Sequence, residues 1–262
     1  MEKQSDIRFY VGRALIAILI FTVVYLAFMG VRLLRTRESE RAFKARMWAE
    51  PITRFESEVR ILPGGALLVS EAIAVQAKGQ MIRRGLRRGL SLTFKDGAGA
   101  EHSAKYEYLG VLLDGSRFPL LVDRVQNMDV VDLRQPAGIA PGDHLFQLQY
   151  KTEHRVQAVG SREELVYDVT GGWRLIIARA AAVVRLPELL LADAVDCRGM
   201  IAPSDDPRRA VNAPGDVEVL REIDPERKDT GVITLRTTRP LELNEHFIIH
   251  LAWPAGFAYK PS

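Results

Sequence analysis

Two histidines near the end of the chain have a spacing that could bind a metal ion. His246 and His250 are four residues apart, which would place both imidazoles on one face of a helix. Around them, however, the apolar residues Phe247, Ile249 and Leu251 recur at every second position, which is typical of a strand. On a strand the two imidazoles lie about 13 Å apart, too far to share an ion. The sequence therefore predicts no metal site and no cofactor.

The chain offers few nucleophiles or acid/base pairs. Cys197 is the single cysteine, and because no histidine lies near it in sequence we expect a partly buried residue rather than a catalytic thiolate. A lone cysteine also excludes an intramolecular disulfide and a zinc ribbon. Glu163 and Glu164 are adjacent, so on a strand they point to opposite faces and cannot form an acid/base pair. These patterns predict a protein that is not an enzyme.

The most unusual charged segment is a tandem Arg-Arg-Gly-Leu repeat that contains Arg83, Arg84, Arg87 and Arg88. From residue 78 to residue 95 there are six basic side chains and no acidic one. Charges packed so closely repel one another, and they would suit anionic lipid head groups or an acidic partner surface. The alternative is a solvated loop whose arginines pair with acidic residues elsewhere in the chain.

An uncharged run of eighteen residues, 14–31, lies between Arg13 and Arg32. As a helix it would be about 27 Å long, close to the hydrocarbon thickness of a bilayer. We therefore expect an N-terminal tail over 1–13 and a transmembrane helix over 14–31, kept as a signal anchor because Arg32 and Arg35 stand where a cleavage site would lie. Residues 32–50 are predicted to form a charged juxtamembrane helix or stalk, in which Arg32 and Arg35 are candidates for binding lipid or a partner.

The charge is concentrated at the N-terminal end of the chain. Residues 1–50 carry nine basic and five acidic side chains, whereas residues 51–262 carry 27 basic and 28 acidic ones. A nearly neutral body argues against a nucleic-acid partner, because nucleic-acid-binding domains carry their excess positive charge on the folded body. The arginines after the membrane segment would by count place the body in the cytoplasm, but long domains cross the membrane largely regardless of charge.

From Ile52 onward the apolar residues recur at every second position, and turn residues such as Pro63 and Gly64 separate the runs. This pattern predicts an antiparallel β-sandwich over residues 51–262, so that the fold class is mainly β. The first two strands form a hairpin about Pro63–Gly65. Further predicted strands are Lys105–Leu113, Ser116–Val122, Met128–Leu133, His144–Thr152, Leu165–Val169, Leu175–Leu186, Val217–Ile223, Val232–Thr238 and Phe247–Trp253.

Short landmarks occur in a characteristic order along this body: Gly64–Glu71, Gly79–Arg87, Pro141–His144, Glu163–Leu165, Val169–Trp173, Leu186–Pro187 and Trp253–Phe257. In this order they resemble the N-terminal domain of the YciQ-like predicted bacterial membrane proteins, a domain-of-unknown-function family. The resemblance implies a membrane segment followed by an extracytoplasmic β-rich domain at the bacterial inner membrane. The family's later membrane helices would begin after Ser262, so we expect a shortened relative or part of a longer chain.

The resemblance supplies no reaction, and two functions fit the residues. The first is a single-span accessory or structural subunit that braces a larger membrane protein assembly, such as a respiratory or photosynthetic complex, through its helix and its β-sandwich. The alternative is an envelope module that binds a carbohydrate or another ligand, or an enzyme, with a site built from Tyr167, Asp168, Trp173 and neighbouring loops. Trp173 follows a glycine turn and is expected to lie in the core rather than in such a site.

Overall fold

The computed structural model describes residues 25, 29, 32, 45, 48–211, 213 and 215–259. The chain divides into one unit over residues 1–48 and a second over residues 49–262. Of the predicted transmembrane helix 14–31, only Tyr25 and Met29 are described, and both are helical and exposed. The rest of that helix, and most of the predicted stalk 32–50, lie outside the described residues. Within the described part of the chain, no helix is long and apolar enough to span a bilayer.

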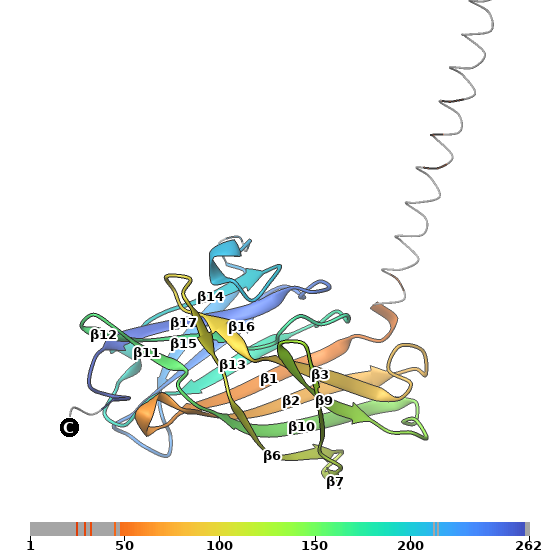
Figure 1. Cartoon of the computed structure of the whole chain (residues 1–262), viewed down its shortest axis with the longest axis horizontal. Helices are drawn as coiled ribbons and strands as arrows, with labels where there is room; N and C mark the ends of the chain where they lie inside the picture. The colour runs from red at the N-terminus through yellow and green to blue at the C-terminus, as the bar shows by residue number, and fades with distance from the viewer. Residues whose placement is uncertain are drawn as a thin grey trace, which may run out of the picture. The chain divides into compact units, whose positions relative to one another are not determined.

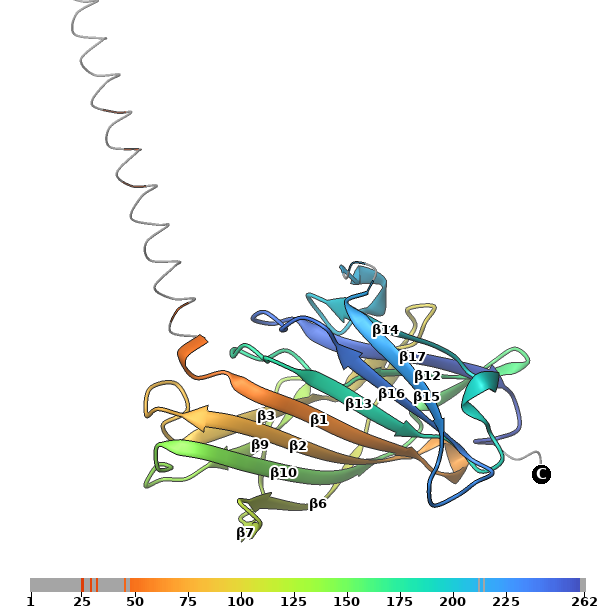
Figure 2. The same ribbon diagram turned by 180° about the vertical axis from the view of Figure 1, so that it is seen from behind.

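The second unit is built almost entirely from strands, as predicted (Figures 1 and 2). Its largest sheet has eight strands in the order β15-β16-β13-β1-β2-β10-β6-β7, and Figure 2 shows β13, β1, β2 and β10 side by side. The bounds are β1 Ile52–Ile61, β2 Leu67–Ala77, β6 Tyr106–Leu113, β7 Ser116–Phe118, β10 Gly142–Thr152, β13 Ala180–Arg185, β15 Val217–Ile223 and β16 Gly231–Thr237.

Three smaller sheets complete the domain. Their orders are β11-β12-β17-β14, β3-β9-β8 and β4-β5. The bounds are β3 Gly85–Ser91, β4 Thr93–Lys95, β5 Glu101–Ser103, β8 Leu121–Val125, β9 Met128–Arg134, β11 Val156–Val159, β12 Arg162–Asp168, β14 Asp196–Ala202 and β17 His246–Pro254. Three short 3₁₀ helices are η1 Pro63–Gly65, η2 Ala192–Ala194 and η3 Pro207–Arg209.

The strand pairing departs from the sequence prediction in two respects. All pairs between named strands are antiparallel except β1 with β13, which run parallel, because β13 returns to the sheet through the 4-stranded sheet rather than through a hairpin. In addition, the sequence analysis did not predict five of the strands: β3, β4, β5, β11 and β14. In β3 the arginine repeat hides the alternation of Leu86 and Leu90.

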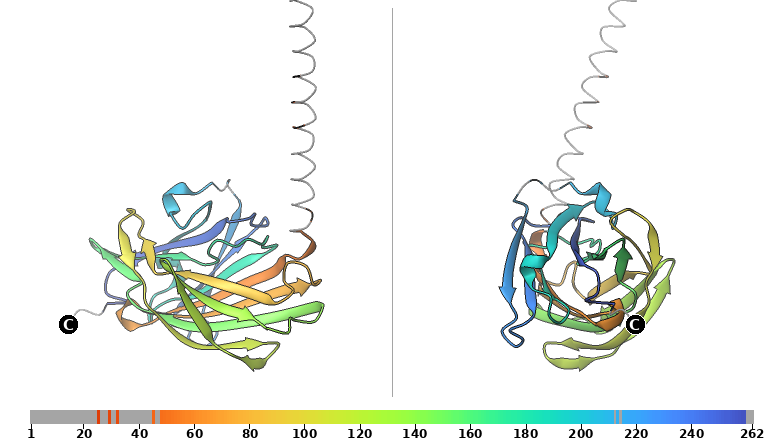
Figure 3. Two further views of the ribbon diagram at one scale, coloured as in Figure 1. Left: turned by 45° about the vertical axis from the view of Figure 1, so that its right-hand side comes forward. Right: turned by 90° about the vertical axis from the view of Figure 1, so that its left-hand side faces the viewer.

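The inward faces of the three larger sheets share one hydrophobic core. Phe55 and Val59 of β1, Phe146 of β10, Leu133 of β9 and Trp253 of β17 are all fully buried in it. Viewed end on, the sheets surround this interior (Figure 3, right). Removing such large apolar side chains from water is the main force that holds the sheets together.

Glu163 and Glu164 of β12 lie on opposite faces of their strand, as predicted. The Glu163 carboxylate is buried and accepts hydrogen bonds from Trp253 Nε1 at 2.7 Å and from the backbone N–H of Ala258 at 2.8 Å. Burial disfavours the charge of Glu163, but these N–H donors outweigh burial and lower its pKa. Glu163 therefore holds the turn that follows β17 against the four-stranded sheet.

A second buried carboxylate, Glu50, fixes the start of the domain. It accepts hydrogen bonds from the backbone N–H groups of residues 78, 80, 81 and 82, at 3.0 Å for Gln80 and Ile82. Burial opposes the charge of Glu50, but the four donors lower its pKa. Through this contact the turn that precedes β3, with Arg83 and Arg84, is held beside the first residues of the second unit.

Candidate functional site

The centre of the domain contains a buried ion pair between Arg88 of β3 and Glu71 of β2. Arg88 Nε donates to Glu71 Oε2 at 2.9 Å, and Arg88 Nη2 donates to Glu71 Oε1 at 2.8 Å. Both side chains are almost completely removed from solvent. Arg88 also donates to the carbonyl oxygens of Gly89, Thr170 and Val169, at 3.0, 2.6 and 3.2 Å. All five N–H donors of this guanidinium therefore have an acceptor.

Two tyrosines extend this network toward the four-stranded sheet. Tyr150 of β10 donates to Glu71 Oε1 at 2.8 Å, and its hydroxyl lies 2.7 Å from that of Tyr167 of β12. Burial, reinforced by the negative charge of Glu71, raises the pKa of both phenols, so both stay protonated. Burial alone would lower the pKa of Arg88, but the Glu71 charge outweighs burial and raises it.

The position of this pair explains why the arginine repeat behaves differently from the sequence prediction. Leu86, Arg88 and Leu90 point inward from β3, whereas Arg87 is exposed. The prediction that Arg88 binds lipid or a partner is wrong, because its guanidinium is buried and fully paired inside the domain. The alternative, in which an arginine of the repeat pairs with an acidic residue elsewhere in the chain, holds for Arg88. The sequence did contain a signal for this pairing. Glu71 stands among the inward-facing apolar residues of β2, and Arg88 stands among those of β3.

The other candidate residues of the sequence analysis do not join Arg88. Arg83, Arg84 and Arg87 are exposed, Arg83 and Arg84 in the turn before β3 and Arg87 on the outer face of β3. Arg32 is an exposed helical residue of the first unit. Arg35 lies outside the described residues. Their predicted binding of lipid or a partner stays a prediction.

Beside the ion pair, His246 of β17 and Asp168 of β12 form a second polar pair. His246 Nδ1 lies 2.6 Å from Asp168 Oδ2, and Asp168 Oδ1 accepts a hydrogen bond from the Gly171 N–H at 2.9 Å. A Cβ atom on Gly172 would lie 2.7 Å from His246 Nε2, so only glycine lets the backbone pass this close. Burial tends to lower the pKa of His246, but the Asp168 carboxylate outweighs burial and raises it.

Arg88 of the first pair and both residues of the second line a cleft of about 140 Å³. Tyr167, Asp168 and His246 line the cleft, together with Phe94 of β4 and Arg155 of the turn between β10 and β11. Two of the three residues named for the alternative function, Tyr167 and Asp168, therefore do meet at a cleft. Trp173 does not line it: as predicted, Trp173 is buried in the core, and its Nε1 donates to the Thr170 carbonyl oxygen at 2.7 Å.

The remaining candidates for chemistry lie apart from this cleft or are individually paired. Cys197 is half-buried as predicted, and burial raises the pKa of its thiol despite Arg221 Nη2 at 3.0 Å. His250 lies on β17, as the alternation predicted, and its Nε2 is 3.3 Å from Glu164 Oε1. Among the described residues, no group of three or more histidine, cysteine or acidic side chains is arranged to hold a metal ion.

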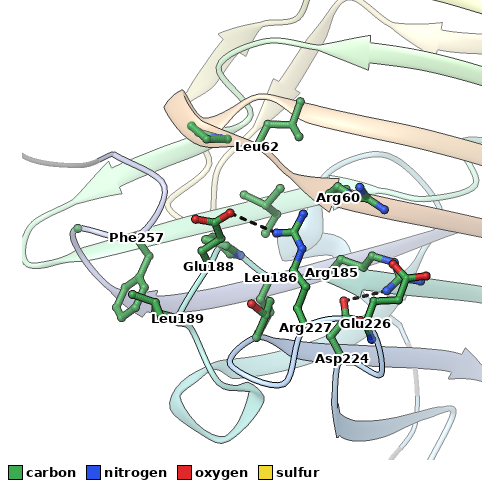
Figure 4. A pocket seen from close by; sticks show the side chains of 15 residues that line it. Arg60, Leu62, Arg185, Leu186, Glu188, Leu189, Asp224, Glu226, Arg227 and Phe257 are labelled. Carbon is green, nitrogen blue, oxygen red and sulfur yellow. Dashed lines mark hydrogen bonds and ion pairs between the residues drawn. The ribbon is translucent and has the colours of Figure 1, made fainter.

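A larger pocket of about 250 Å³ lies at the carboxyl ends of β1 and β13 (Figure 4). Its charged side chains are paired with one another: Arg185 donates to Asp224 at 2.8 Å, and Arg227 lies 3.5 Å from Glu188. Arg185 also donates to Glu58 of β1 at 2.6 Å. Because these charges compensate one another, the pocket offers a ligand little electrostatic attraction, and the smaller cleft is the stronger candidate site.

Comparison with known proteins places the domain in context. The sequence model of the predicted membrane protein (DUF2207) N-terminal domain matches residues 51–253. The protein YciQ of Escherichia coli (strain K12) is 28% identical over 125 residues, which is 47% of this chain and 20% of YciQ. The chain thus aligns with about a fifth of the curated relative it matches.

Solved structures with partial likeness include an M1 zinc metallopeptidase from Deinococcus radiodurans, which is 10% identical at a TM-score of 0.43 and covers 76% of this chain and 42% of its own. Yeast LTA4 hydrolase is 9% identical at a TM-score of 0.45, and the alignment covers 78% of this chain and 28% of the hydrolase chain.

The buried ion pair generates a first prediction. Replacing Glu71 by Gln leaves the Arg88 charge buried without a counter-charge, so we expect the free energy of unfolding to fall by about 3–5 kcal/mol. Replacing both residues, Glu71→Gln with Arg88→Met, should cost less than the sum of the single changes, because no unpaired charge is left. Arg87→Met, on the exposed face of the same strand, is the control and should change stability by no more than about 0.5 kcal/mol. Urea unfolding of the full chain in detergent measures the free energy of unfolding of Glu71→Gln, Arg88→Met, the double variant and Arg87→Met. If the losses of the two single variants add up to that of the double variant, the pairing is contradicted.

The His246–Asp168 pair generates a second prediction, on pH. Because the folded state raises the pKa of His246, the stabilisation is fully present below the ordinary imidazole pKa of about 6.5 and is lost as pH rises through the raised value. Asp168→Asn removes the carboxylate, so burial should then lower the pKa of His246 below its ordinary value. NMR titration of the histidine ring protons measures this shift, with His250, whose pKa is lowered by burial, as the internal reference. An unchanged pKa of His246 in the variant would rule out the pairing.

Proposed function

Because this chain belongs to the predicted membrane protein (DUF2207) family, whose N-terminal domain it matches, we propose that it is a membrane-anchored accessory subunit that works by docking on a partner protein rather than by catalysis. The anchor is the uncharged run 14–31, and the β domain lies outside the cytoplasm at a bacterial inner membrane. Two features of the domain support this proposal: a basic turn beside the first residues of the domain and an exposed apolar hairpin at a sheet edge.

The basic turn contains Arg83 and Arg84, which are exposed. Glu50 binds the backbone of the residues just before them, so the turn lies where the chain enters the domain from its N-terminal segment. We propose that the turn faces the membrane surface. Exposed arginines in that position suit the phosphates of anionic lipids.

The apolar hairpin, defined here as residues 120–128, is the observation that carries the proposal. All five residues of β8 are exposed, so this strand packs neither of its faces into the core. Within the described residues, β8 pairs only with β9, which leaves its other edge free of backbone partners. The exposed apolar side chains of the hairpin are Leu120, Leu121, Val122, Val125 and Met128.

An exposed apolar edge strand is a template for strand addition, which proteins normally prevent with charges. β8 carries two charged residues, Asp123 and Arg124, and Arg124 pairs with Asp129 of the same hairpin at 2.9 Å. β15, an edge strand of the eight-stranded sheet, carries three charged residues, Glu218, Arg221 and Glu222. The hairpin therefore fits an extended apolar segment of a partner protein, added alongside β8.

The location of the turn end of the hairpin favours a protein over the lipid bilayer as its occupant. This end pairs through Met128 with Ser91, whereas the basic turn precedes Gly85 at the opposite end of β3, about 20 Å away over seven strand residues. The other end of the hairpin lies nearer the basic turn, because Leu121 pairs with Asp132 of β9, which is adjacent to β3. When Arg83 and Arg84 face the lipid, the turn end of the hairpin points away from it, toward the extramembrane part of a partner.

The membrane-facing turn gives a third prediction. With a photo-crosslinking amino acid in place of the exposed Met81, irradiation of cells should attach an anionic phospholipid to the β domain. The yield should fall severalfold in Arg83→Ser/Arg84→Ser and stay unchanged in Arg236→Ser, an exposed arginine of β16. Protease added to intact spheroplasts should remove the β domain together with its adduct. A domain that yields no lipid adduct, or that is protected until lysis, would contradict this orientation.

The hairpin gives a fourth prediction. Lysines at an edge strand block strand addition, so Leu121→Lys/Val125→Lys should convert the membrane-extracted complex to free protein on native gels without changing the melting temperature. Leu220→Lys/Ile223→Lys on β15 is the matched control and should leave the complex intact. A wild-type protein that migrates alone would refute the proposal. Protection of the β8 amides from hydrogen exchange in nanodiscs of pure lipid would assign the hairpin to the bilayer instead.

A further inference from the structure

The cleft beside His246 contains a buried arginine whose charge the domain does not balance. Arg155 is only 4% exposed, yet within the described part of the chain no carboxylate forms an ion pair with it and its Nε has no hydrogen-bond acceptor. Its Nη2 donates to one backbone carbonyl oxygen, that of Val166, at 3.3 Å. Arg88, in the same domain, has a carboxylate partner and five hydrogen bonds, whereas Arg155 has no carboxylate partner and a single hydrogen bond.

What surrounds Arg155 is aromatic. Its guanidinium carbon lies 3.8 Å from the centre of the Phe94 ring and 5.4 Å from that of Tyr167. Rings at these distances stabilise a cation through their faces. A guanidinium that stacks on a ring keeps its N–H groups in its own plane. They can still donate to an acceptor that lies at the edge of the guanidinium.

The other charges of the cleft are largely paired. Lys95 binds Asp206 at 3.2 Å, His246 binds Asp168, and Arg88 binds Glu71. Asp205, half-buried in the wall, is the carboxylate of the lining with no ion pair among the described residues. The lining therefore holds one buried cation without an ion pair, Arg155, and one half-buried carboxylate without one, Asp205, beside the apolar side chains of Leu90, Phe94 and Met128.

We propose that this cleft binds a small organic carboxylate, with the two oxygens on the guanidinium of Arg155 and the apolar body against Phe94 and Met128. A carboxylate matches the planar fork of a guanidinium and carries the single negative charge that one unpaired arginine needs. A phosphate dianion would bring two charges to one unpaired cation. The site adjoins the apolar hairpin, since Met128 belongs to both, but it concerns a small ligand rather than the docking partner.

Calorimetric titration of the full chain in detergent tests this, with benzoate as the probe and benzyl alcohol as its neutral counterpart. We expect benzoate to bind with one-to-one stoichiometry, benzyl alcohol not to bind, and inorganic phosphate to bind more weakly than benzoate. Arg155→Met should weaken benzoate binding by about tenfold or more, because a charge-assisted pair is lost. Asp205→Asn should strengthen it, because a competing negative charge leaves the wall. Arg236→Met, on the outer face of β16, is the control and should bind as the wild type does.

Stability separates a binding role from a structural one. If Arg155 is held ready for an anion, removing its unpaired charge leaves the melting temperature of the ligand-free protein unchanged or higher. Benzoate should raise the melting temperature of the wild type and not that of Arg155→Met. Wild-type protein that binds no benzoate, or that binds phosphate more tightly than benzoate, would overturn the proposal. So would an Asp205→Asn variant that loses stability without gaining affinity, because Asp205 would then be the counter-ion of Arg155.

Discussion

The domain depends on one charge pair, Arg88 with Glu71, placed where three sheets meet. Glu71 belongs to the eight-stranded sheet, Arg88 to the three-stranded sheet, and the carbonyl oxygens of Val169 and Thr170 follow the last residue of β12. A buried guanidinium without acceptors would be very costly, so the four hydrogen bonds from Arg88 to Glu71, Val169 and Thr170 restrict where these three segments lie. Apolar contacts hold the sheets together without direction, whereas these hydrogen bonds are directional.

The neighbouring arginine, Arg155, is its counterpart. Both guanidinium groups are buried and both lie against aromatic rings, at 5.5 Å from Phe55 for Arg88 and at 3.8 Å from Phe94 for Arg155. Only Arg88 has a carboxylate, so its charge is satisfied by the fold, whereas that of Arg155 is available to something that enters the cleft. The same residue type thus serves structure at one position and recognition at the other, and the difference lies in the counter-charge.

The proposed function assigns different tasks to the two ends of β3. At its start, Glu50 binds the backbone of the residues just before Arg83 and Arg84, so the basic turn lies beside the first residues of the domain. At its end, the pairing of Ser91 with Met128 places the turn end of the apolar hairpin about 20 Å away. We propose that the first end faces lipid and the second a partner protein.

By itself, the sequence determined the mainly β fold, most strands, the opposite faces of Glu163 and Glu164, the burial of Trp173 and the membrane family, because alternation, turn residues and ordered landmarks are local properties of the chain. It did not determine which charges meet. Glu71 and Arg88 are 17 residues apart, Asp168 and His246 are 78 apart, and β1 and β13 run parallel only because of how the sheets close. Whether an arginine is solvated, paired or left without a counter-charge depends on residues that are distant in sequence, so the cleft, and the different surroundings of Arg83, Arg88 and Arg155, could be decided only by the tertiary structure.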